Sequence, residues 1–166
     1  MTRPETAFVA LGSNLGNSID NVTKAIARLR SFSEKALRSS SLWRTTPVDC
    51  PPESPPFINA VVAFVARKDE TPRTLLRKLR ALEKEFGRRP KTVLNEPRPL
   101  DLDLIAFGSR AARSARLILP HPRAHLRRFV LQPLSEIAPD LILPGQTKTV
   151  RQLLRALKSG ERMRRL

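Results

Sequence analysis

The chain has 166 residues, 40% of them hydrophobic and 28% charged, which is typical of one globular domain and too apolar for a disordered protein. Its 31 basic and 15 acidic residues give a net charge of +16, which attracts nucleic acid, anionic membrane or a phosphorylated ligand without choosing among them. No apolar run is long enough to span a bilayer and the one cysteine excludes an intramolecular disulfide, so we expect a cytoplasmic protein without a membrane segment.

The start of the chain predicts a strand followed by a helix. Residues 6–11 read as a short buried strand that ends at a turn, and Asn17 or Ser18 can cap the helix behind it. The apolar residues of this helix recur at helical spacing and are Ile19, Val22, Ala25, Ile26, Leu29 and Phe32.

Two strands and a long loop follow. The pattern favours strands over residues 35–44 and 58–65. Between them, residues 45–56 hold five prolines. Loops of this length and composition are often functional or mobile.

The second helix has clear ends. Thr71 caps it, Pro72 stands at its first position and Gly87 ends it. Its apolar stripe consists of Leu75, Leu76, Leu79, Leu82 and Phe86. A basic, irregular stretch over residues 88–99 then leads to a strand over residues 100–107.

Shorter elements end the chain. We expect a short strand at 116–119, a cation-rich loop at 120–129 and one or two helical turns at 130–138. A helix from Thr149 has an apolar face made of Val150, Leu153, Leu154 and Leu157. The basic tail from about residue 159 holds few residues able to pack, so we expect it to be dispensable for catalysis.

The strand over residues 100–107 carries two carboxylates on one face. Alternation places Leu100, Leu102, Leu104 and Ala106 on one face, and Asp101, Asp103, Ile105 and Phe107 on the other. Carboxylates two residues apart have Cα atoms roughly 6.5–7 Å apart and repel each other unless a cation lies between them. Oxygen ligands suit Mg²⁺, and a carboxylate pair can bridge two such ions. The alternative is an ordinary edge strand whose aspartates are solvated or paired with Arg98.

Basic residues surround this strand in the sequence. They are Arg88, Arg89, Arg98, His121, Arg123, His125, Arg127 and Arg128. A polyphosphate on Mg²⁺ needs such donors to balance its remaining charge, although a solvated basic loop has the same composition. No glycine precedes a lysine, so there is no Walker A P-loop and a kinase would need another fold. The two histidines lack a neighbouring cysteine or carboxylate at ligand spacing, which argues against zinc.

Five motifs occur in order along the chain. They are LGSNLG (11–16), WRTTPV (43–48), PPFINAVV (55–62), PRPLDLDLI (97–105) and PHPRAHLRRFVLQPLSEIAPD (120–140). Together they resemble the 6-hydroxymethyl-7,8-dihydropterin pyrophosphokinase family over residues 6–158, and PRPLDLDLI is the most specific of them. The resemblance implies an enzyme of folate biosynthesis that transfers pyrophosphate from ATP to a dihydropterin alcohol, giving the pterin diphosphate and AMP.

The same resemblance implies a fold and roles for particular residues. The fold would be a ferredoxin-like sandwich with a mainly antiparallel sheet flanked by helices, which agrees with the single α+β domain over residues 1–166 that the interleaved strands and helices favour. Asp101 and Asp103 would hold two Mg²⁺ ions, while Arg88 and Arg98 would act on the phosphates during catalysis. The residues implied for ATP are Glu83, Arg116, His121 and Arg127, and those implied for the pterin are Thr45, Val48, Phe57, Asn59 and Phe129.

A basic RNA-binding module is the alternative from another class. It would explain the charge but requires exposed aromatic platforms, whereas aromatic residues make up 5% of this chain and tyrosine is absent. It also leaves Asp101 and Asp103 unexplained. A different Mg²⁺-dependent transferase would keep the aspartates but has no need of Phe57, Asn59 and Phe129. We therefore expect small-molecule substrates, no specific nucleic acid, and a monomer.

Overall fold

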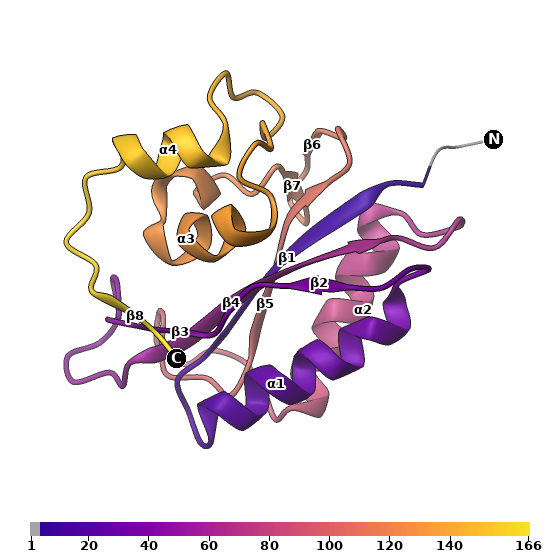
Figure 1. Cartoon of the computed structure of the whole chain (residues 1–166). Helices are drawn as coiled ribbons and strands as arrows, with labels where there is room; N and C mark the ends of the chain where they lie inside the picture. Colours follow the sequence, from indigo (N-terminus) through magenta and orange to yellow (C-terminus); the bar gives the residue numbers. More distant parts are fainter. Residues whose placement is uncertain (1–3) are drawn as a thin grey trace.

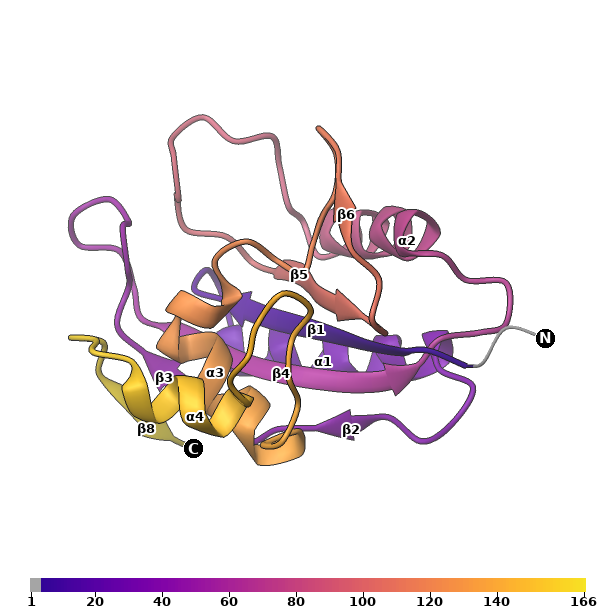
Figure 2. The same ribbon diagram turned by 90° about the horizontal axis from the view of Figure 1, so that it is seen from above.

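The computed structural model describes residues 4–166, in which one sheet is covered by helices on both faces (Figures 1 and 2). The elements follow in the order β1 (Thr6–Ser13), α1 (Ser18–Leu29), η1 (Arg30–Phe32), β2 (Arg38–Ser39), β3 (Trp43–Thr45), β4 (Phe57–Val65), α2 (Pro72–Glu85), β5 (Asp101–Phe107), β6 (Ala112–Arg113), β7 (Ile118–Leu119), η2 (Ala124–Leu126), α3 (Arg128–Ile137), α4 (Val150–Ala156) and β8 (Met163–Arg165). The predicted α+β class, with a mainly antiparallel sheet flanked by helices, is confirmed. The first three residues of the domain predicted over 1–166 lie outside the described residues.

The main sheet is antiparallel, in the order β5-β1-β4-β3-β8, with β2 also paired to β4. The strands predicted at 6–11 and 58–65 are confirmed as β1 and β4. The strand predicted over 35–44 is only partly correct, because strand structure begins at Arg38 and residues 40–42 separate β2 from β3. There the Ser40 hydroxyl accepts a hydrogen bond from the Val61 backbone N–H (2.9 Å), which takes the place of a backbone acceptor in the ladder.

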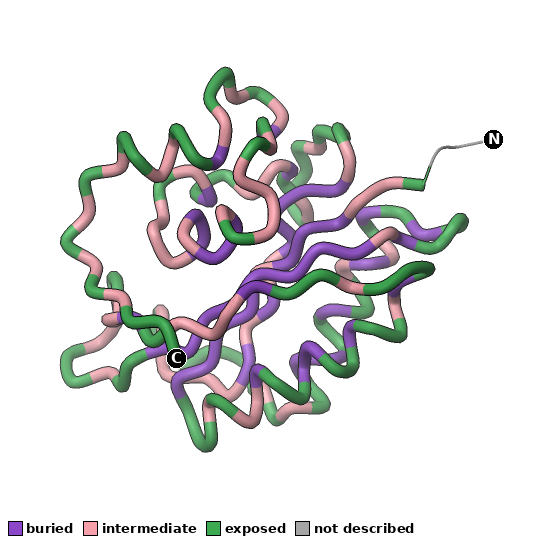
Figure 3. The backbone as a smooth tube through the Cα atoms, viewed as in Figure 1, coloured by how far each residue is buried: buried purple, intermediate pink, exposed green. Residues whose placement is uncertain are grey.

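Two apolar cores lie on opposite faces of the sheet. Helices α1 and α2 cover one face, and α3 and α4 cover the other (Figures 1 and 2). Buried residues run along the middle of β1 and β4, between these layers (Figure 3). Asn17 caps α1 by accepting a hydrogen bond from the Asp20 backbone N–H (3.2 Å). Ile19 is 44% exposed, so its predicted place in the apolar stripe is wrong, since the buried stripe begins at Val22.

A bulge in β5 changes which of its side chains share a face. The register between β1 and β5 shifts between Phe8 and Val9, which leaves Ile105 as an extra residue. Beyond this point Phe107 lies in the core beneath α1 and α2, while Ala106 lies in the core beneath α3. The predicted faces of these two residues are therefore wrong, whereas the alternation is correct at the two aspartates, which precede the bulge.

The C-terminal part of the chain contains more structure than predicted. Helices α2 and α4 begin behind Thr71 and Thr149, and each cap forms a capping box. The helical turns predicted at 130–138 begin earlier, at Arg128, and the predicted strand at 116–119 forms β7 in a separate two-stranded sheet with β6. The tail, predicted to hold few residues able to pack, also forms a strand, because β8 pairs with β3 at the edge of the main sheet, although none of residues 160–166 is buried.

Within residues 4–166, no helix combines the length and the apolar character that crossing a membrane would require.

Candidate active site

Two adjoining pockets share one wall at the end of the sheet formed by β1, β4 and β5. The first, which we call the aromatic pocket, is lined by Ala10, Leu11, Gly12, Thr45, Thr46, Val48, Asp49, Cys50, Phe57, Asn59 and Phe129, together with the shared wall. The second, which we call the basic pocket, is lined by Arg80, Glu83, Arg88, Arg89, Pro90, Lys91 and His121, together with the same wall. The shared wall consists of Asn95, Arg98, Asp101, Asp103, Arg123 and Arg127.

The strand register places the carboxylates beside the aromatic pocket. Gly12 of β1 lies between Asp101 of β5 and Asn59 of β4, as their antiparallel partner on both sides. A Cβ atom at Gly12 would lie 2.9 Å from the Asn59 Oδ1 atom, so only glycine allows the amide to lie this close to β1. The Asn59 Nδ2 atom donates a hydrogen bond to the Thr45 Oγ1 atom (2.6 Å), which fixes the amide from the other side.

Asp101 is paired with two arginines. Its Oδ1 atom lies 2.6 Å from the Arg88 Nη1 atom, and its Oδ2 atom lies 3.3 Å from the Arg98 Nη2 atom. Burial by itself would raise the pKa of this carboxyl, but the charges of Arg98 and Arg88 outweigh it and hold the pKa below its ordinary value. Asp101 is therefore ionised at neutral pH.

Asp103 has the opposite electrostatic environment. None of the ion pairs among residues 4–166 includes its carboxylate. Burial, followed by the negative charge of Asp101, raises the pKa of Asp103 to about 6, against smaller opposing effects of Arg80 and Arg127. One carboxylate of the pair thus forms ion pairs with protein cations, and the other has no ion-pair partner within residues 4–166.

Arg98 connects the two pockets. Its guanidinium lies over the ring of Phe57, with the Cζ atom 5.2 Å from the ring centroid. Its backbone N–H donates to the Asn14 Oδ1 atom (2.9 Å), which anchors the loop before β5 to the turn after β1. The buried Nε atom of Arg98 has no hydrogen-bond partner. A buried donor without a partner is costly, by roughly 1–3 kcal/mol, so a ligand acceptor would be well matched here.

Glu83 holds the basic pocket in shape. It is buried, and its Oε1 atom accepts hydrogen bonds from the Leu102 backbone N–H (2.8 Å), from Arg80 (2.8 Å) and from Arg88 (3.4 Å). Burial raises its pKa, and the hydrogen bonds from Leu102 and Arg80 oppose this. The carboxylate thus fixes α2 to β5 and orients Arg88 toward Asp101.

His121 and Arg127 close the other side of the basic pocket. Burial, and then the charges of Arg127 and Arg123, lower the pKa of His121 to about 4, so the imidazole is neutral at pH 7. Its Nδ1 atom accepts a hydrogen bond from the Arg123 backbone N–H (3.2 Å). The Arg127 guanidinium lies over the ring of Phe129, with its Cζ atom 5.3 Å from the centroid.

The structure brings together all but one of the site residues that the resemblance implies. Arg116 is exposed between β6 and β7 and lines neither pocket, because that hairpin belongs to a separate small sheet. Of the other cations that the sequence placed around β5, Arg123 lines both pockets, whereas His125 and Arg128 line neither. Arg80 lines the basic pocket although the sequence analysis did not name it. The sequence offered one hint for Arg80, which lies three residues before Glu83 on the same face of α2.

A hydrogen bond joins the two long loops above the aromatic pocket. The Asn95 Nδ2 atom donates to the Asp49 backbone carbonyl (2.7 Å), which links residues 45–56 to residues 88–99. Both residues have positive φ angles, 51° at Asp49 and 55° at Asn95, a conformation that Asn and Asp tolerate better than most residues.

The family comparison agrees with this geometry. A family model described as 7,8-dihydro-6-hydroxymethylpterin-pyrophosphokinase (HPPK) matches residues 8–139. The chain is 42% identical over 148 residues to a 2-amino-4-hydroxy-6-hydroxymethyldihydropteridine pyrophosphokinase of Synechocystis sp., covering 89% of this chain and 74% of the relative. It is 36% identical over 151 residues to a Haemophilus influenzae protein of the same name, covering 89% and 92%.

Solved structures share the fold with much lower identity. The wild-type HPPK-DHPS of Plasmodium falciparum superimposes with a TM-score of 0.72 at 13% identity, covering 92% of this chain and 41% of that one. The chain therefore spans less than half of that longer protein, and this likeness concerns the fold alone.

Proposed function

The chain belongs to the 7,8-dihydro-6-hydroxymethylpterin-pyrophosphokinase family, and we propose that it transfers pyrophosphate from ATP to 6-hydroxymethyl-7,8-dihydropterin in folate biosynthesis. The products are the pterin diphosphate and AMP. The observation that carries this proposal is the position of Asp101 and Asp103 on the wall shared by the two pockets. A planar heterocycle suits one side of the wall and a polyphosphate suits the other, so the reacting groups would meet at the carboxylates.

The aromatic pocket would bind the pterin. Phe57 and Phe129 line it, and aromatic side chains stack on a planar ring while a few fixed polar groups orient it. Asn59 is such a group, because its Nδ2 atom is already bonded to Thr45 and its Oδ1 atom remains available to accept a hydrogen bond from the ring.

The basic pocket would bind the triphosphate. Six arginines and one lysine line it against three carboxylates, so it attracts a polyanion. When the hydroxymethyl oxygen gives up its proton to solvent and bonds to the β-phosphorus, the bond from that phosphorus to the oxygen it shares with the α-phosphorus breaks, and AMP leaves with additional negative charge. Arg98 belongs to the shared wall and Arg88 lies beside it, where fixed guanidiniums would stabilise this developing charge.

Two Mg²⁺ ions are the cofactors that the carboxylate pair would hold. Within residues 4–166 there is no cluster of three or more metal-ligating side chains, and Mg²⁺ commonly takes one or two carboxylates and completes its shell with water and substrate phosphates. Asp103 suits such a ligand role because its carboxylate lacks a counter-charge and is repelled by Asp101. When bound, the ions would neutralise and orient the ATP oxygens.

The remaining expectations concern partners and location. The family and the bacterial relatives lend no support to the RNA-binding alternative. We propose that the protein acts as a monomer in the cytoplasm on these two small-molecule substrates, and sedimentation of the purified chain tests its oligomeric state.

One assay tests the activity directly. The purified protein should release AMP from ATP only when Mg²⁺ and the dihydropterin alcohol are both present, and the pterin diphosphate should form in equal amount. Asp103→Asn should lose this activity, whereas Asp140→Asn, at an exposed carboxylate paired with Arg151, should keep it. A folded protein without pterin-dependent AMP release would overturn the proposal, and tight retention of a particular RNA at physiological salt would favour the alternative.

A further inference from the structure

The C-terminal segment, residues 159–166, extends along the wall of the aromatic pocket. After α4 the chain crosses from one face of the molecule to the edge of the sheet, where β8 lies against β3 (Figure 1). On this path it makes hydrogen bonds with two residues that line the pocket, Phe129 and Thr46, and its Met163 lies opposite a third, Thr45, in the pairing of β3 with β8.

Glu161 supplies a cap that α3 lacks in its own sequence. The residue at the N-cap position, Arg127, makes no side-chain capping hydrogen bond. Instead the Glu161 Oε2 atom accepts a hydrogen bond from the Phe129 backbone N–H (2.9 Å), and the two residues are 32 positions apart in the chain. A carboxylate at this place both satisfies an orphan N–H and lies at the positive end of the helix dipole. It thereby fixes the backbone from which the Phe129 ring enters the pocket.

The neighbouring residue fixes the opposite wall. The Arg162 backbone N–H donates to the Thr46 Oγ1 atom (3.1 Å), and the Thr46 backbone N–H donates to the Arg162 carbonyl (3.1 Å). Met163 then pairs with Thr45, whose hydroxyl accepts the hydrogen bond from Asn59. Two consecutive residues, Glu161 and Arg162, therefore join the Phe129 wall to the wall that holds Asn59.

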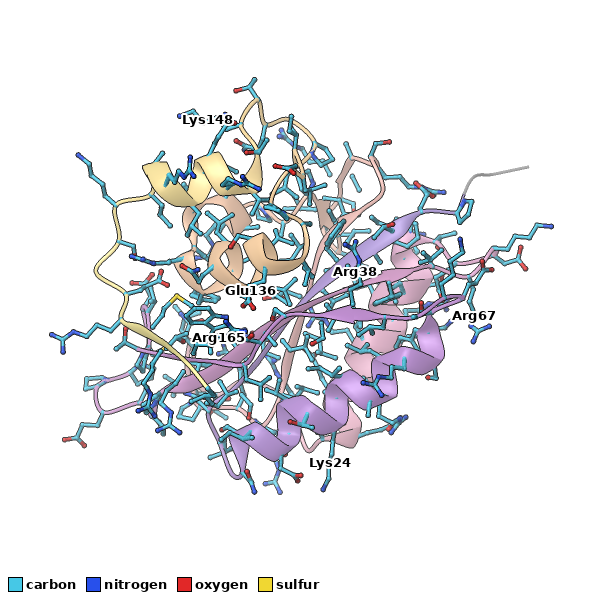
Figure 4. The ribbon with its side chains drawn as sticks, viewed as in Figure 1. Lys24, Arg38, Arg67, Glu136, Lys148 and Arg165 are labelled. Carbon is cyan, nitrogen blue, oxygen red and sulfur yellow. The ribbon has the colours of Figure 1, made fainter. Side chains whose placement is uncertain are left out.

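The end of the chain is secured by a second group of side chains on α3 and β3. The Arg165 Nε atom donates to the Ser41 Oγ atom (2.8 Å), and its Nη2 atom lies 4.0 Å from the Glu136 Oε2 atom. Glu136 in turn accepts a hydrogen bond from the Trp43 indole N–H (2.5 Å). Glu136 and Arg165 lie close together beside β3 (Figure 4). These contacts hold β8 in register and so hold Glu161 in place.

We propose that the C-terminal segment sets the width of the aromatic pocket, and that Glu161 is a positioning residue for pterin binding. The inference rests on the proposed function, since it assigns the aromatic pocket to the pterin. Glu161 itself does not touch the substrate. Its carboxylate holds Phe129 at the distance from the Asn59 wall at which a flat ring can stack and still reach the amide. Without this carboxylate, the backbone of Phe129 is no longer fixed and the aromatic pocket loses its set width. The basic pocket is unchanged, because no residue of the C-terminal segment lines it.

Glu161→Ala and Glu161→Gln test this inference, with Glu85→Ala as the matched control. Glu85 is an exposed glutamate that pairs with Arg28 between α1 and α2 and lines neither pocket. Removing the charged hydrogen bond in Glu161→Ala should raise the KM and the Kd for the pterin about tenfold, with the KM for ATP within about twofold of wild type. Glu161→Gln keeps an acceptor oxygen and should show a smaller rise. Glu85→Ala should change neither constant.

A shortened chain that ends at Gly160 extends the test. It should show at least the pterin defect of Glu161→Ala, and thermal unfolding shows whether it still folds. If it does not fold, the two point variants decide. Unchanged pterin constants in a folded Glu161→Ala protein, or equal losses for ATP and pterin, would overturn the inference while wild-type transfer leaves the proposed function intact. A wild-type protein that makes no pterin diphosphate would overturn the proposed function and the inference with it.

Discussion

Replacing Asp103 by asparagine should stabilise the protein without metal while abolishing its activity. Burial and the neighbouring charge of Asp101 raise the pKa of Asp103 from 3.8 to about 6 in the folded chain. A carboxyl whose pKa is raised by folding binds its proton more tightly in the folded chain than in the unfolded chain. Its contribution to stability is therefore fully present below its ordinary pKa and is lost as the pH rises through its pKa in the folded chain. Above pH 6, therefore, the ionised Asp103 lowers the stability of the metal-free protein.

The size of the effect follows from the shift. The full pKa shift of Asp103 corresponds to a loss of at most about 3 kcal/mol in the free energy of unfolding at pH 8. Solvent screens the partly exposed carboxylate, so the expected gain in the free energy of unfolding of Asp103→Asn is about 1–2 kcal/mol. In a domain of this size that gain raises the Tm by about 2–8 °C. The difference between variant and wild type should shrink as the pH falls below 6 and vanish only well below 3.8, where Asp103 is protonated in both the folded and the unfolded chain.

Thermal unfolding in EDTA between pH 4 and 8 measures this difference. Asp140→Asn is the control, because Asp140 has a side chain that is 83% exposed, and its removal should change stability by less than about 0.5 kcal/mol. Asp101→Asn should have the opposite sign and destabilise by about 2–4 kcal/mol, because Arg88 and Arg98, 14% and 16% exposed, lose their shared partner. An Asp103→Asn protein no more stable than wild type at pH 8 in EDTA would refute this account of the pair.

Three further predictions concern catalysis. Arg98→Ala should lower kcat by about 10²–10³ and change the KM for ATP much less, and an effect confined to KM would show that Arg98 contributes only uniform binding. Asn59→Leu should raise the KM for the pterin by about tenfold or more, because the Oδ1 acceptor and the bond to Thr45 both disappear. Steady-state kinetics with each substrate varied in turn measure this, and an equal rise in the KM for ATP would contradict the assignment of Asn59 to the pterin. Residues 45–56 and 88–99 should gain hydrogen-exchange protection together when both substrates bind, because closure excludes water and one hydrogen bond already joins the two loops; equal protection with and without substrates would contradict this.

Local pattern and spacing were enough to predict several elements of the fold and the centre of the site. Thr71 and Thr149 begin their helices with capping boxes, because a cap depends on residues only three positions apart. The alternation in β5 correctly places Asp101 and Asp103 on one face, and like the caps it depends only on neighbours in the chain. The family resemblance carried by the motifs, rather than local pattern, implied Phe57, Asn59 and Phe129, which line the aromatic pocket.

The tertiary structure decided how those parts meet. Asp101 and Asp103 each stand between two leucines, so the sequence does not distinguish them. Arg88 and Arg98 both pair with Asp101, however, so the pKa of Asp101 is lowered while that of Asp103 is raised. The bulge at Ile105 depends on the pairing of β5 with β1, and the formation of β8 by the tail depends on the free edge of β3. Glu161 illustrates the general reason. Its partner, the Phe129 backbone N–H, lies 32 residues away, and an interaction across that distance exists only after packing has brought the two segments together, which no local pattern encodes.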